Sequence, residues 1–289
     1  MDKRKIMLIN IDSKIPNLAL KKIEKYHLDS GNEVIWDFPL MRNKVDKIYV
    51  SCIFTKNRDK CKEWEGVSEI GGSGYNLKIN LPIEIEKVKP KINIGFATRG
   101  CIRKCPFCIV PEKEGKIRIE GDLYDIWDGK SKNVVFLDNN ILGLKKHFYM
   151  ICRQAQKENI TIEFNQGLDI RLLDIDIAKE LKKTKLSELW FAWDNMEDEQ
   201  IVLKGIDILK KAGIKSFRFY VLVGFNTTLE EDLYRFRKLK TISTDRKLNI
   251  RPYCMRYETC KDKKEYIRLA EWVNMPWAFM KIDYEDWNK

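Results

Sequence analysis

From residue 92 onward, short apolar runs alternate along the chain with amphipathic runs. A short apolar run between turn residues is typical of a buried strand, and apolar residues three or four positions apart are typical of a helix. Six such units in series with short connections favour a parallel (β/α)6 barrel, or part of one, in the TIM-barrel manner. The expected strands are 93–98, 134–137, 161–165, 188–193, 216–223 and 249–253, and the expected helices are 121–128, 144–158, 175–183, 198–212, 229–241 and 263–273.

The first ninety residues carry a smaller pattern of the same kind. Residues 4–10 predict a strand, residues 17–28 an amphipathic helix, and residues 33–38 and 47–54 two further strands. This order predicts a small, Rossmann-like α/β unit with a parallel sheet. Residues 82–91 contain two prolines and five charged residues, as expected of a linker. We therefore expect two domains, residues 1–90 and residues 91–289, the second ending in a helical tail.

Composition narrows the class of protein. The 289 residues are 44% hydrophobic, enough for a core, so global disorder is not expected. No apolar run reaches the roughly 18 residues of a membrane span, and the opening segment is too short in apolar residues for a secretory signal. We expect a cytoplasmic protein with no membrane partner. The formal net charge of +11 favours anionic partners such as nucleic acid, although Lys residues spread over the whole length also fit a solvated surface.

Three of the eight cysteines fall within eight residues of one another. Cys101, Cys105 and Cys108 follow the first expected barrel strand, on the edge where parallel barrels place their chemistry. A cubane cluster normally takes four thiolates, so three thiolates leave one iron open to a substrate or cofactor. Neighbouring Arg103 and Lys104 favour the thiolate form. The spacing therefore predicts a [4Fe–4S] cluster with one open iron.

A structural zinc site is the main alternative for these cysteines. Such a site usually has two cysteine pairs, or one pair with two nearby histidines. The only histidines are His27 and His147, each isolated, and the next cysteine pair, Cys254 and Cys260, is separated by five residues. This spacing favours iron over zinc, and two cysteines are too few for a second cluster.

Residues 95–115 resemble the signature of the radical S-adenosylmethionine (SAM) superfamily, because Phe107 stands directly before the third cysteine in a C-x₃-C-x-F-C pattern. The resemblance extends in strand-helix order to about residue 280. It implies that the open iron chelates SAM and that one electron cleaves SAM to methionine and a 5′-deoxyadenosyl radical. That radical abstracts hydrogen from the substrate. An electron donor such as flavodoxin or ferredoxin is implied as a partner.

The resemblance also assigns SAM contacts to residues near the strand ends. Phe107 is expected to lie against the adenine. Asp138, Asn139 and Asn140 stand where the family usually has a Gly-Gly-Glu-like turn that binds the SAM amino group. The three side chains differ from that turn, but their oxygens are able to accept from an ammonium. A helix cap or a surface charge is the alternative for any one of them.

Later strands add further polar candidates. Arg171 would meet the SAM carboxylate, and Asp194 would bind the ribose hydroxyls. A Gly-Phe-Pro-Gly-like turn of the family is matched here with Asn226 in place of proline, so only its backbone role carries over. The candidate cofactor-binding residues of these later strands are Gln166, Asp169, Arg171, Asp194, Val223 and Gly224.

The opening segment resembles the start of the cobalamin-binding domains that precede many radical SAM barrels. Asp12 matches their motif, but Lys14 stands where the cobalt-ligating histidine would be, and the motif glycine is missing. The unit is also short for a complete cobalamin fold. A degenerate Rossmann-like cap is favoured, and cobalamin bound without a protein ligand stays open.

Three functions follow from these patterns. The first is a radical SAM enzyme whose substrate is not identified, with a nucleic acid or nucleotide weakly favoured by the charge. The second is a cobalamin-dependent radical SAM methyltransferase. The third is a nucleic-acid-binding protein with a structural metal.

Overall fold

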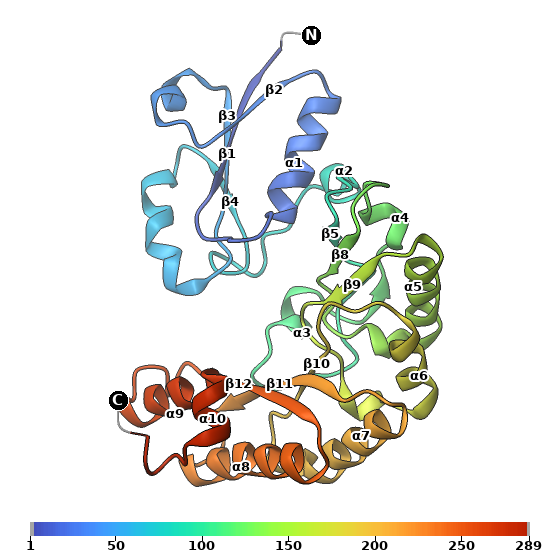
Figure 1. Cartoon of the computed structure of the whole chain (residues 1–289). Coiled ribbons are helices and arrows are strands. Elements are labelled where there is room, and N and C mark those ends of the chain that lie inside the picture. The colour runs from blue at the N-terminus through green and yellow to red at the C-terminus, as the bar shows by residue number, and fades with distance from the viewer. Residues whose placement is uncertain (1–2, 288–289) are drawn as a thin grey trace. The chain divides into compact units, whose positions relative to one another are not determined.

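The computed structural model describes residues 3–287 and divides the chain into two compact α/β units with parallel sheets (Figure 1). The first unit consists of the described residues up to 95 together with residues 109–115 and 124–130. The second consists of residues 96–108, residues 116–123 and the described residues from 131 onward.

The first unit takes in two segments that lie beyond the expected boundary at residue 90. Lys113 donates from Nζ to the carbonyl oxygens of Leu77 and Ile79, at 3.0 and 2.6 Å. Asn93 Nδ2 donates to Asp128 Oδ2 at 2.9 Å. These hydrogen bonds join residues far apart in the sequence, so no local pattern could place the later segments in this unit.

The elements of the first unit are β1 (Lys5–Asn10), α1 (Leu18–Asp29), β2 (Glu33–Trp36), η1 (Pro39–Lys44), β3 (Lys47–Ser51), η2 (Thr55–Trp64), β4 (Glu69–Gly71), α2 (Ile83–Glu86), β5 (Ile94–Gly95), α3 (Val110–Lys113) and, from its second residue on, α4 (Leu123–Ile126). The strands β2-β1-β3-β4 form a parallel sheet in that order. Ile6 and Leu8 of β1 pack with residues of α1, whereas Met7 and Ile9 pack with Trp64 of η2. Helix α1 therefore covers one face of the sheet and η2 the other (Figure 1).

Most elements expected in the first ninety residues are present, each within three residues of the expected ends. The linker expected at residues 82–91 needs correction, because α2 begins within it. Ile85 of α2 is 3% exposed and packs in the cluster that contains Ile6 and Leu8. One buried residue in a charged segment produces no periodicity, which is why the sequence did not reveal this helix.

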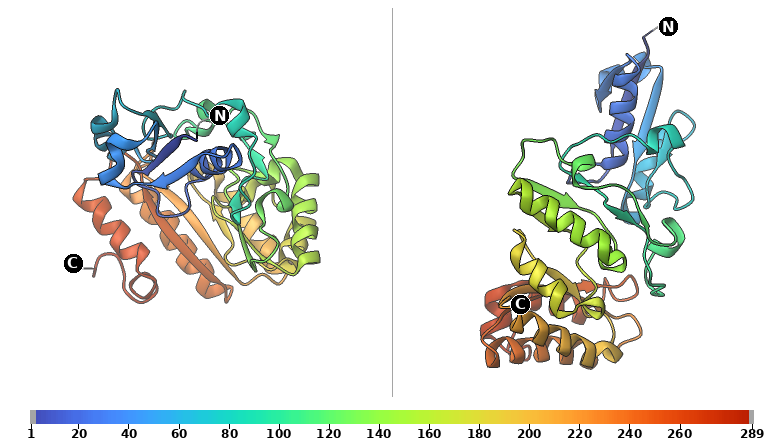
Figure 2. Two further views of the ribbon diagram at one scale, coloured as in Figure 1. Left: turned by 90° about the horizontal axis from the view of Figure 1, so that it is seen from above. Right: turned by 90° about the vertical axis from the view of Figure 1, so that its right-hand side faces the viewer.

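In the second unit, parallel strands follow one another in chain order. Strand β8 pairs with β9, and β10, β11 and β12 form a second parallel sheet. Single parallel bridges, Ile162 to Leu186 and Leu168 to Phe191, join the two sheets. Helices α5 to α8 run along the outer side of these strands (Figure 2). The elements are β6 (Thr98–Arg99), β7 (Arg118–Ile119), β8 (Asn133–Phe136), η3 (Ile141–Leu144), α5 (Lys145–Glu158), β9 (Thr161–Phe164), η4 (Ile170–Leu172), α6 (Ile175–Lys183), β10 (Trp190–Ala192), η5 (Met196–Asp198), α7 (Glu199–Lys211), β11 (Ser216–Val223), α8 (Leu229–Asp245), β12 (Asn249–Arg256), α9 (Lys264–Asn274) and α10 (Pro276–Lys281).

The expected strand at residues 93–98 is interrupted. The chain forms β5, leaves strand conformation at residues 96–97, and resumes as β6, which pairs antiparallel with β7. Asn93 has a positive φ of 63°, outside the strand region, so the strand starts only at the next residue. The backbone N–H groups of Ala97 and Thr98 bond to a side chain, Asp138, instead of to a neighbouring strand.

Side-chain caps explain where several helices begin. The Asn17 side chain accepts from the backbone of Leu20, and Asp174 accepts from the first turn of α6. Thr228 and Glu231 form a reciprocal capping box at the start of α8. Such caps satisfy backbone N–H groups that have no partner within the helix.

Helices α9 and α10 form the expected helical tail. Trp272 is buried and packs edge-on against Phe279 at 5.1 Å between ring centroids, whereas Trp277 is 56% exposed. Among residues 3–287, no helix is both long enough and apolar enough to cross a bilayer.

Candidate functional site

The three clustered cysteines lie on the loop that follows β6 in the second unit. Each thiol is half-buried, whereas the other five cysteines are buried. Cys108 N donates to Cys105 O at 3.0 Å, which folds the loop into a tight turn. The Cys101 sulfur accepts from Arg103 N at 3.3 Å and from Asn140 Nδ2 at 3.5 Å. The loop therefore presents its thiols partly to solvent and surrounds one of them with N–H donors.

These features fit an iron–sulfur cluster. Hydrogen bonds to sulfur are among the contacts by which proteins tune such clusters. Within residues 3–287, no three His, Cys, Asp or Glu side chains gather as ligands of one metal ion. Three partly exposed thiols on one loop, one of which accepts from two N–H groups, are a donor set that suits a cluster.

Asp138 lies beyond the end of β8 and is 1% exposed. Its Oδ2 accepts from Ala97 N at 3.0 Å, and its Oδ1 accepts from both the backbone N and the hydroxyl of Thr98 at 2.6 Å. Burial raises the pKa of Asp138 to about 6, although these hydrogen bonds counteract it. The carboxylate holds the backbone just before the cysteine loop.

Asp169, after β9, joins three segments of the site. Its Oδ2 accepts from Arg103 Nε at 3.0 Å and from Asn140 Nδ2 at 3.1 Å. Its Oδ1 accepts from Arg171 Nε at 2.7 Å. Burial alone would raise the pKa of Asp169, but hydrogen bonds and charge from Arg171, and then from Arg103, outweigh burial and hold it below its usual value. The cysteine loop is thereby tied to the ends of β8 and β9.

Asn140 contributes an unused acceptor to this network. The residue is 3% exposed, and its amide nitrogen donates to Cys101 Sγ and to Asp169. Its Oδ1 is buried and has no hydrogen-bond partner among the residues that the structure describes. A buried acceptor without a partner is costly, so it marks a position where a donor from a ligand would be favourable.

Arg171 lies between carboxylates and the cysteine loop. Besides Asp169, it contacts Asp198, with 3.4 Å between Nη1 and Oδ2. Burial raises the pKa of the Cys105 thiol, and the nearby guanidinium of Arg171 counteracts this rise. Arg171 is therefore the positive charge next to the second cysteine.

Asp194 is half-buried after β10 and accepts from Leu222 N at 3.2 Å. Burial raises its pKa to about 6, although this hydrogen bond and the charges of Arg235 and Arg171 counteract it. The residue thus links the ends of β10 and β11.

A buried ion pair in α8, which sequence reasoning missed, supports the same strand ends. Arg235 pairs with Asp232, and both side chains are fully buried. Arg235 donates to the carbonyl oxygens of Trp193 and Leu222 at 2.6 and 2.7 Å. Asp232 Oδ2 accepts from Gly224 N at 2.9 Å. The available signal was that these two charges share a helix face with Phe236 and Leu239, which are core positions.

Phe107, Val223 and Gly224 lie at the same edge. The Phe107 ring packs edge-on against Phe225, with 5.4 Å between centroids. Gly224 has a φ of +74°, and a Cβ built there would lie 2.4 Å from Cys260 Sγ. Cys260 Sγ in turn donates to Val223 O at 3.3 Å. The close approach of Cys260 explains why this turn requires glycine.

The remaining candidates and the scattered cysteines differ in their burial. Gln166 is exposed in the turn after β9, and Asn139 is half-buried beside Asn140. Cys254 and Cys260 are both buried, as are Cys52 and Cys61 of the first unit.

The segment that was compared with a cobalamin motif makes structural contacts in the first unit. Asp12 accepts from Ile53 N at 2.8 Å, from Phe54 N at 2.9 Å and from Asn57 Nδ2 at 3.2 Å. Lys14 is exposed. Asp12 therefore fixes the loop that follows β3, and nothing in these contacts favours cobalamin.

Comparison with known proteins shows distant similarity. No family model matches the chain. In an alignment that covers 59% of its length, the chain is 25% identical to the tRNA-2-methylthio-N(6)-dimethylallyladenosine synthase of Flavobacterium psychrophilum and 23% identical to that of Flavobacterium johnsoniae. The matched region spans 42% of each of these relatives.

Among solved structures, HydG, a maturase of the [FeFe]-hydrogenase, aligns with 93% of this chain and 66% of its own, at 9% identity and a TM-score of 0.46. The chain is a distant homologue of the two synthases over the matched region.

Proposed function

We propose that the chain is a radical SAM enzyme whose [4Fe–4S] cluster is held by Cys101, Cys105 and Cys108. The observation that carries this proposal is the loop itself: three partly exposed thiols on one turn, at the edge where the parallel strands end. With cluster and SAM bound, the chemistry supplied is reductive cleavage of SAM to a 5′-deoxyadenosyl radical that abstracts hydrogen from the substrate. The partial barrel expected for such enzymes agrees with the parallel order of β8 to β12.

The polar residues around the loop take distinct roles in this proposal. Asn140 presents its unpartnered Oδ1 to the SAM ammonium, with the Asp169 carboxylate beside it. Asp138 acts as a positioning residue, since Ala97 and Thr98 already engage both its oxygens. This role replaces a direct contact between Asp138 and SAM.

The remaining contacts to SAM are those that the resemblance to radical SAM enzymes implies. Phe107, held by Phe225, supplies an apolar surface for the adenine. Arg171 would meet the SAM carboxylate, and Asp194 would bind the ribose hydroxyls. The backbone at Val223 and Gly224 borders the same space. Asn139, which is half-buried, and Gln166, which is exposed, stay candidates for a SAM contact by the resemblance alone.

A nucleic acid or nucleotide is the proposed class of substrate. The two distant relatives are named for a modified adenosine in tRNA. The net charge of +11 attracts a polyanion over long distances. An electron donor such as flavodoxin or ferredoxin completes the proposed reaction.

Anaerobic reconstitution tests the proposal. The wild-type protein should bind about four irons per chain and release 5′-deoxyadenosine from SAM when reduced with dithionite. Cys105→Ala should abolish both. Cys152→Ala, which removes a buried thiol from α5, is the matched control and should retain both. Full iron content and SAM cleavage in Cys105→Ala would contradict the assignment.

A further inference from the structure

One face of the β10-β11-β12 sheet carries side chains that the helices of the second unit leave partly exposed. The register places Trp190, Arg218 and Arg251 in one row across the three strands. Tyr220 and Tyr253 lie in the next row, beside Ala192. Alternate residues on the same strands, such as Phe191, Phe219 and Val221, are fully buried on the opposite face. That buried face lies under α7 and α8 (Figure 1).

The three aromatic rings of the exposed face, Trp190, Tyr220 and Tyr253, form what we call the aromatic platform. Trp190 and Tyr220 stack with 4.3 Å between centroids and 14° between planes. Tyr253 meets both rings edge-on and is 45% exposed. Trp190 Nε1 donates to Glu188 at 3.0 Å, and Tyr220 Oη donates to Asn165 O at 3.2 Å. Hydrogen bonds thus hold both inner rings at their polar ends.

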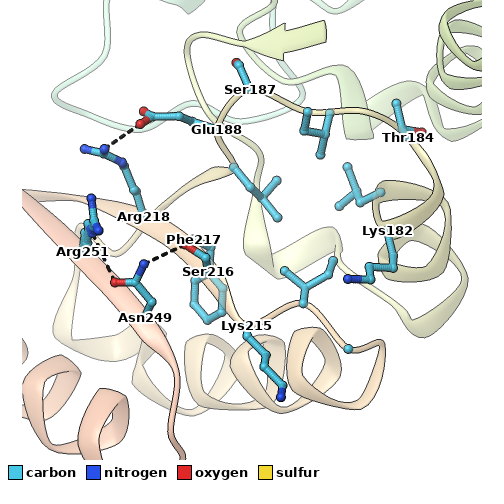
Figure 3. Close-up of a pocket in the computed structure, with 15 residues that line it drawn as sticks. Lys182, Thr184, Ser187, Glu188, Lys215, Ser216, Phe217, Arg218, Asn249 and Arg251 are labelled. Atoms are coloured by element: carbon cyan, nitrogen blue, oxygen red, sulfur yellow. Dashed lines mark hydrogen bonds and ion pairs between the residues drawn. The ribbon is translucent and has the colours of Figure 1, made fainter. Parts of the chain in front are cut away.

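A basic hollow adjoins the platform at the amino-terminal ends of the same strands. Its volume is about 660 Å³. Four basic residues line it, against a single acidic residue, Glu188, which already pairs with Arg218 at 2.5 Å. Figure 3 shows Arg218 and Arg251 on one side of the hollow and Lys182 and Lys215 on the others. The lining therefore carries an excess of positive charge.

Arg218 connects the two features. Its guanidinium lies 4.9 Å from the centroid of the Trp190 ring, while the same side chain lines the hollow. Arg251, its neighbour in the register, is exposed. Exposed rings and cations in adjacent rows match a ligand in which flat apolar groups alternate with anionic groups at short intervals. Single-stranded nucleic acid has this composition, and proteins bind it by stacking bases on aromatic side chains and placing phosphates beside cations.

We propose that the aromatic platform and the basic hollow together bind a single-stranded segment of nucleic acid. Bases stack on Tyr253 and the Trp190–Tyr220 pair, and the phosphates lie near Arg251, Lys215 and Lys182. The hollow lies at the ends of the strands opposite to those that adjoin the cysteine loop, so this inference concerns where the nucleic acid docks and goes beyond the proposed function. The binding itself requires neither cluster nor SAM. A double helix would keep its bases stacked internally and away from the platform, so single strands are the preferred form.

Fluorescence anisotropy with the full-length protein tests the inference. The probe is a fluorescein-labelled single-stranded RNA of about 12 nucleotides, a length in the range bound by single-strand-binding domains. Tyr253→Ala should weaken binding about tenfold, as expected for loss of one stacked base. Tyr253→Leu, which keeps an apolar side chain on the sheet, should show a similar loss. Trp277→Ala removes another exposed aromatic, in α10, and serves as the control that should bind normally.

Salt dependence tests the phosphate contacts. Arg251→Gln should reduce the slope of log K against log salt by about 0.7, the value for one phosphate of a single strand. Unchanged affinity in both Tyr253 variants, or an unchanged slope in Arg251→Gln, would overturn the inference. Equal binding of a blunt RNA duplex would also overturn it. A DNA strand of the same sequence distinguishes RNA from DNA as the source of the ligand.

The outcomes also separate this inference from the proposed function. Cys105→Ala should lose SAM cleavage yet bind RNA like the wild type. If the wild type cleaves SAM but binds no single strand, the platform is not a nucleic-acid site and the chain is still a radical SAM enzyme. If RNA binding depends on Tyr253 but no iron is bound, the chain is not a radical SAM enzyme and the platform is still a nucleic-acid site.

Discussion

The carboxylate of Asp169 accepts hydrogen bonds from three side chains of the candidate site. It accepts from Arg103, from Asn140 and from Arg171, and its side chain is 5% exposed. These partners come from the cysteine loop, from the segment after β8 and from η4. Because hydrogen bonds to a buried charge are stronger than those to a neutral group, this one residue stabilises three segments.

Replacing the charge at Asp169 tests this role. Asp169→Asn should lower the free energy of unfolding by about 2 kcal/mol at neutral pH, measured by urea denaturation. Because the pKa of Asp169 is lowered in the folded protein, its carboxylate contributes to the free energy of unfolding at any pH above the ordinary aspartate pKa. This contribution disappears as the pH falls through the lowered value. Asp176→Asn, at an exposed position of α6, is the control and should have little effect. Equal loss in the two variants would contradict the role.

Asp194 should behave in the opposite way. Burial raises its pKa to about 6, so the folded protein binds this proton more tightly than the unfolded chain does. Stability should therefore fall as the pH rises from about 4 to about 6. Asp194→Asn removes this penalty and should raise the free energy of unfolding by up to about 3 kcal/mol at about pH 8, with no gain at about pH 3. A variant that is less stable than the wild type at both pH values would show that the contacts of the carboxylate outweigh its burial.

Among the elements, α8 has two separate functions. Its capping box defines where it begins, and its buried Asp232–Arg235 pair reaches the ends of β10 and β11. A buried ion pair stabilises a fold only if its remaining donors and acceptors are satisfied. Here Arg235 donates its remaining hydrogen bonds to the carbonyl oxygens of Trp193 and Leu222. Only its Nε has no hydrogen-bond partner among the described residues.

Removing one partner of this ion pair should strongly destabilise the protein. Arg235→Met leaves the Asp232 carboxylate buried without its cation, so the free energy of unfolding should drop by about 3–5 kcal/mol. Arg237→Met, which removes an exposed pair with Glu285, should cost less than about 1 kcal/mol. Chemical denaturation compares the two. The double variant Asp232→Leu/Arg235→Met should recover part of the loss, and a double variant as unstable as Arg235→Met alone would show that the pair itself is not the cause.

Element boundaries were predicted best where local periodicity was strong. The expected ranges 175–183 and 216–223 coincide with α6 and β11. Prediction was poorest where long-range contacts decide local structure. The strand expected at 93–98 is broken because Asp138, some forty residues later, takes up the N–H groups of Ala97 and Thr98.

On the scale of the whole molecule, the division of the chain into two compact units predicts that it does not unfold in one step. Urea denaturation should show two transitions, because two-state behaviour is a property of single cooperative domains. Lys113→Met, which removes donors to Leu77 and Ile79, should shift one transition, and Arg235→Met should shift the other. A single transition that both variants shift equally would show that the units unfold cooperatively.

The sequence by itself determined the parallel α/β order of the second unit and the position of the cysteine loop after a strand. Both depend on spacing between neighbours in the chain, which periodicity reveals. Only the tertiary structure decided that Asp138 holds backbone, that Asp169 gathers Arg103 and Asn140, and that Tyr253 stays exposed beside a basic hollow. The physical reason is that the free energy of a polar or aromatic side chain depends on its burial and on its partners in space, which are distant in the sequence.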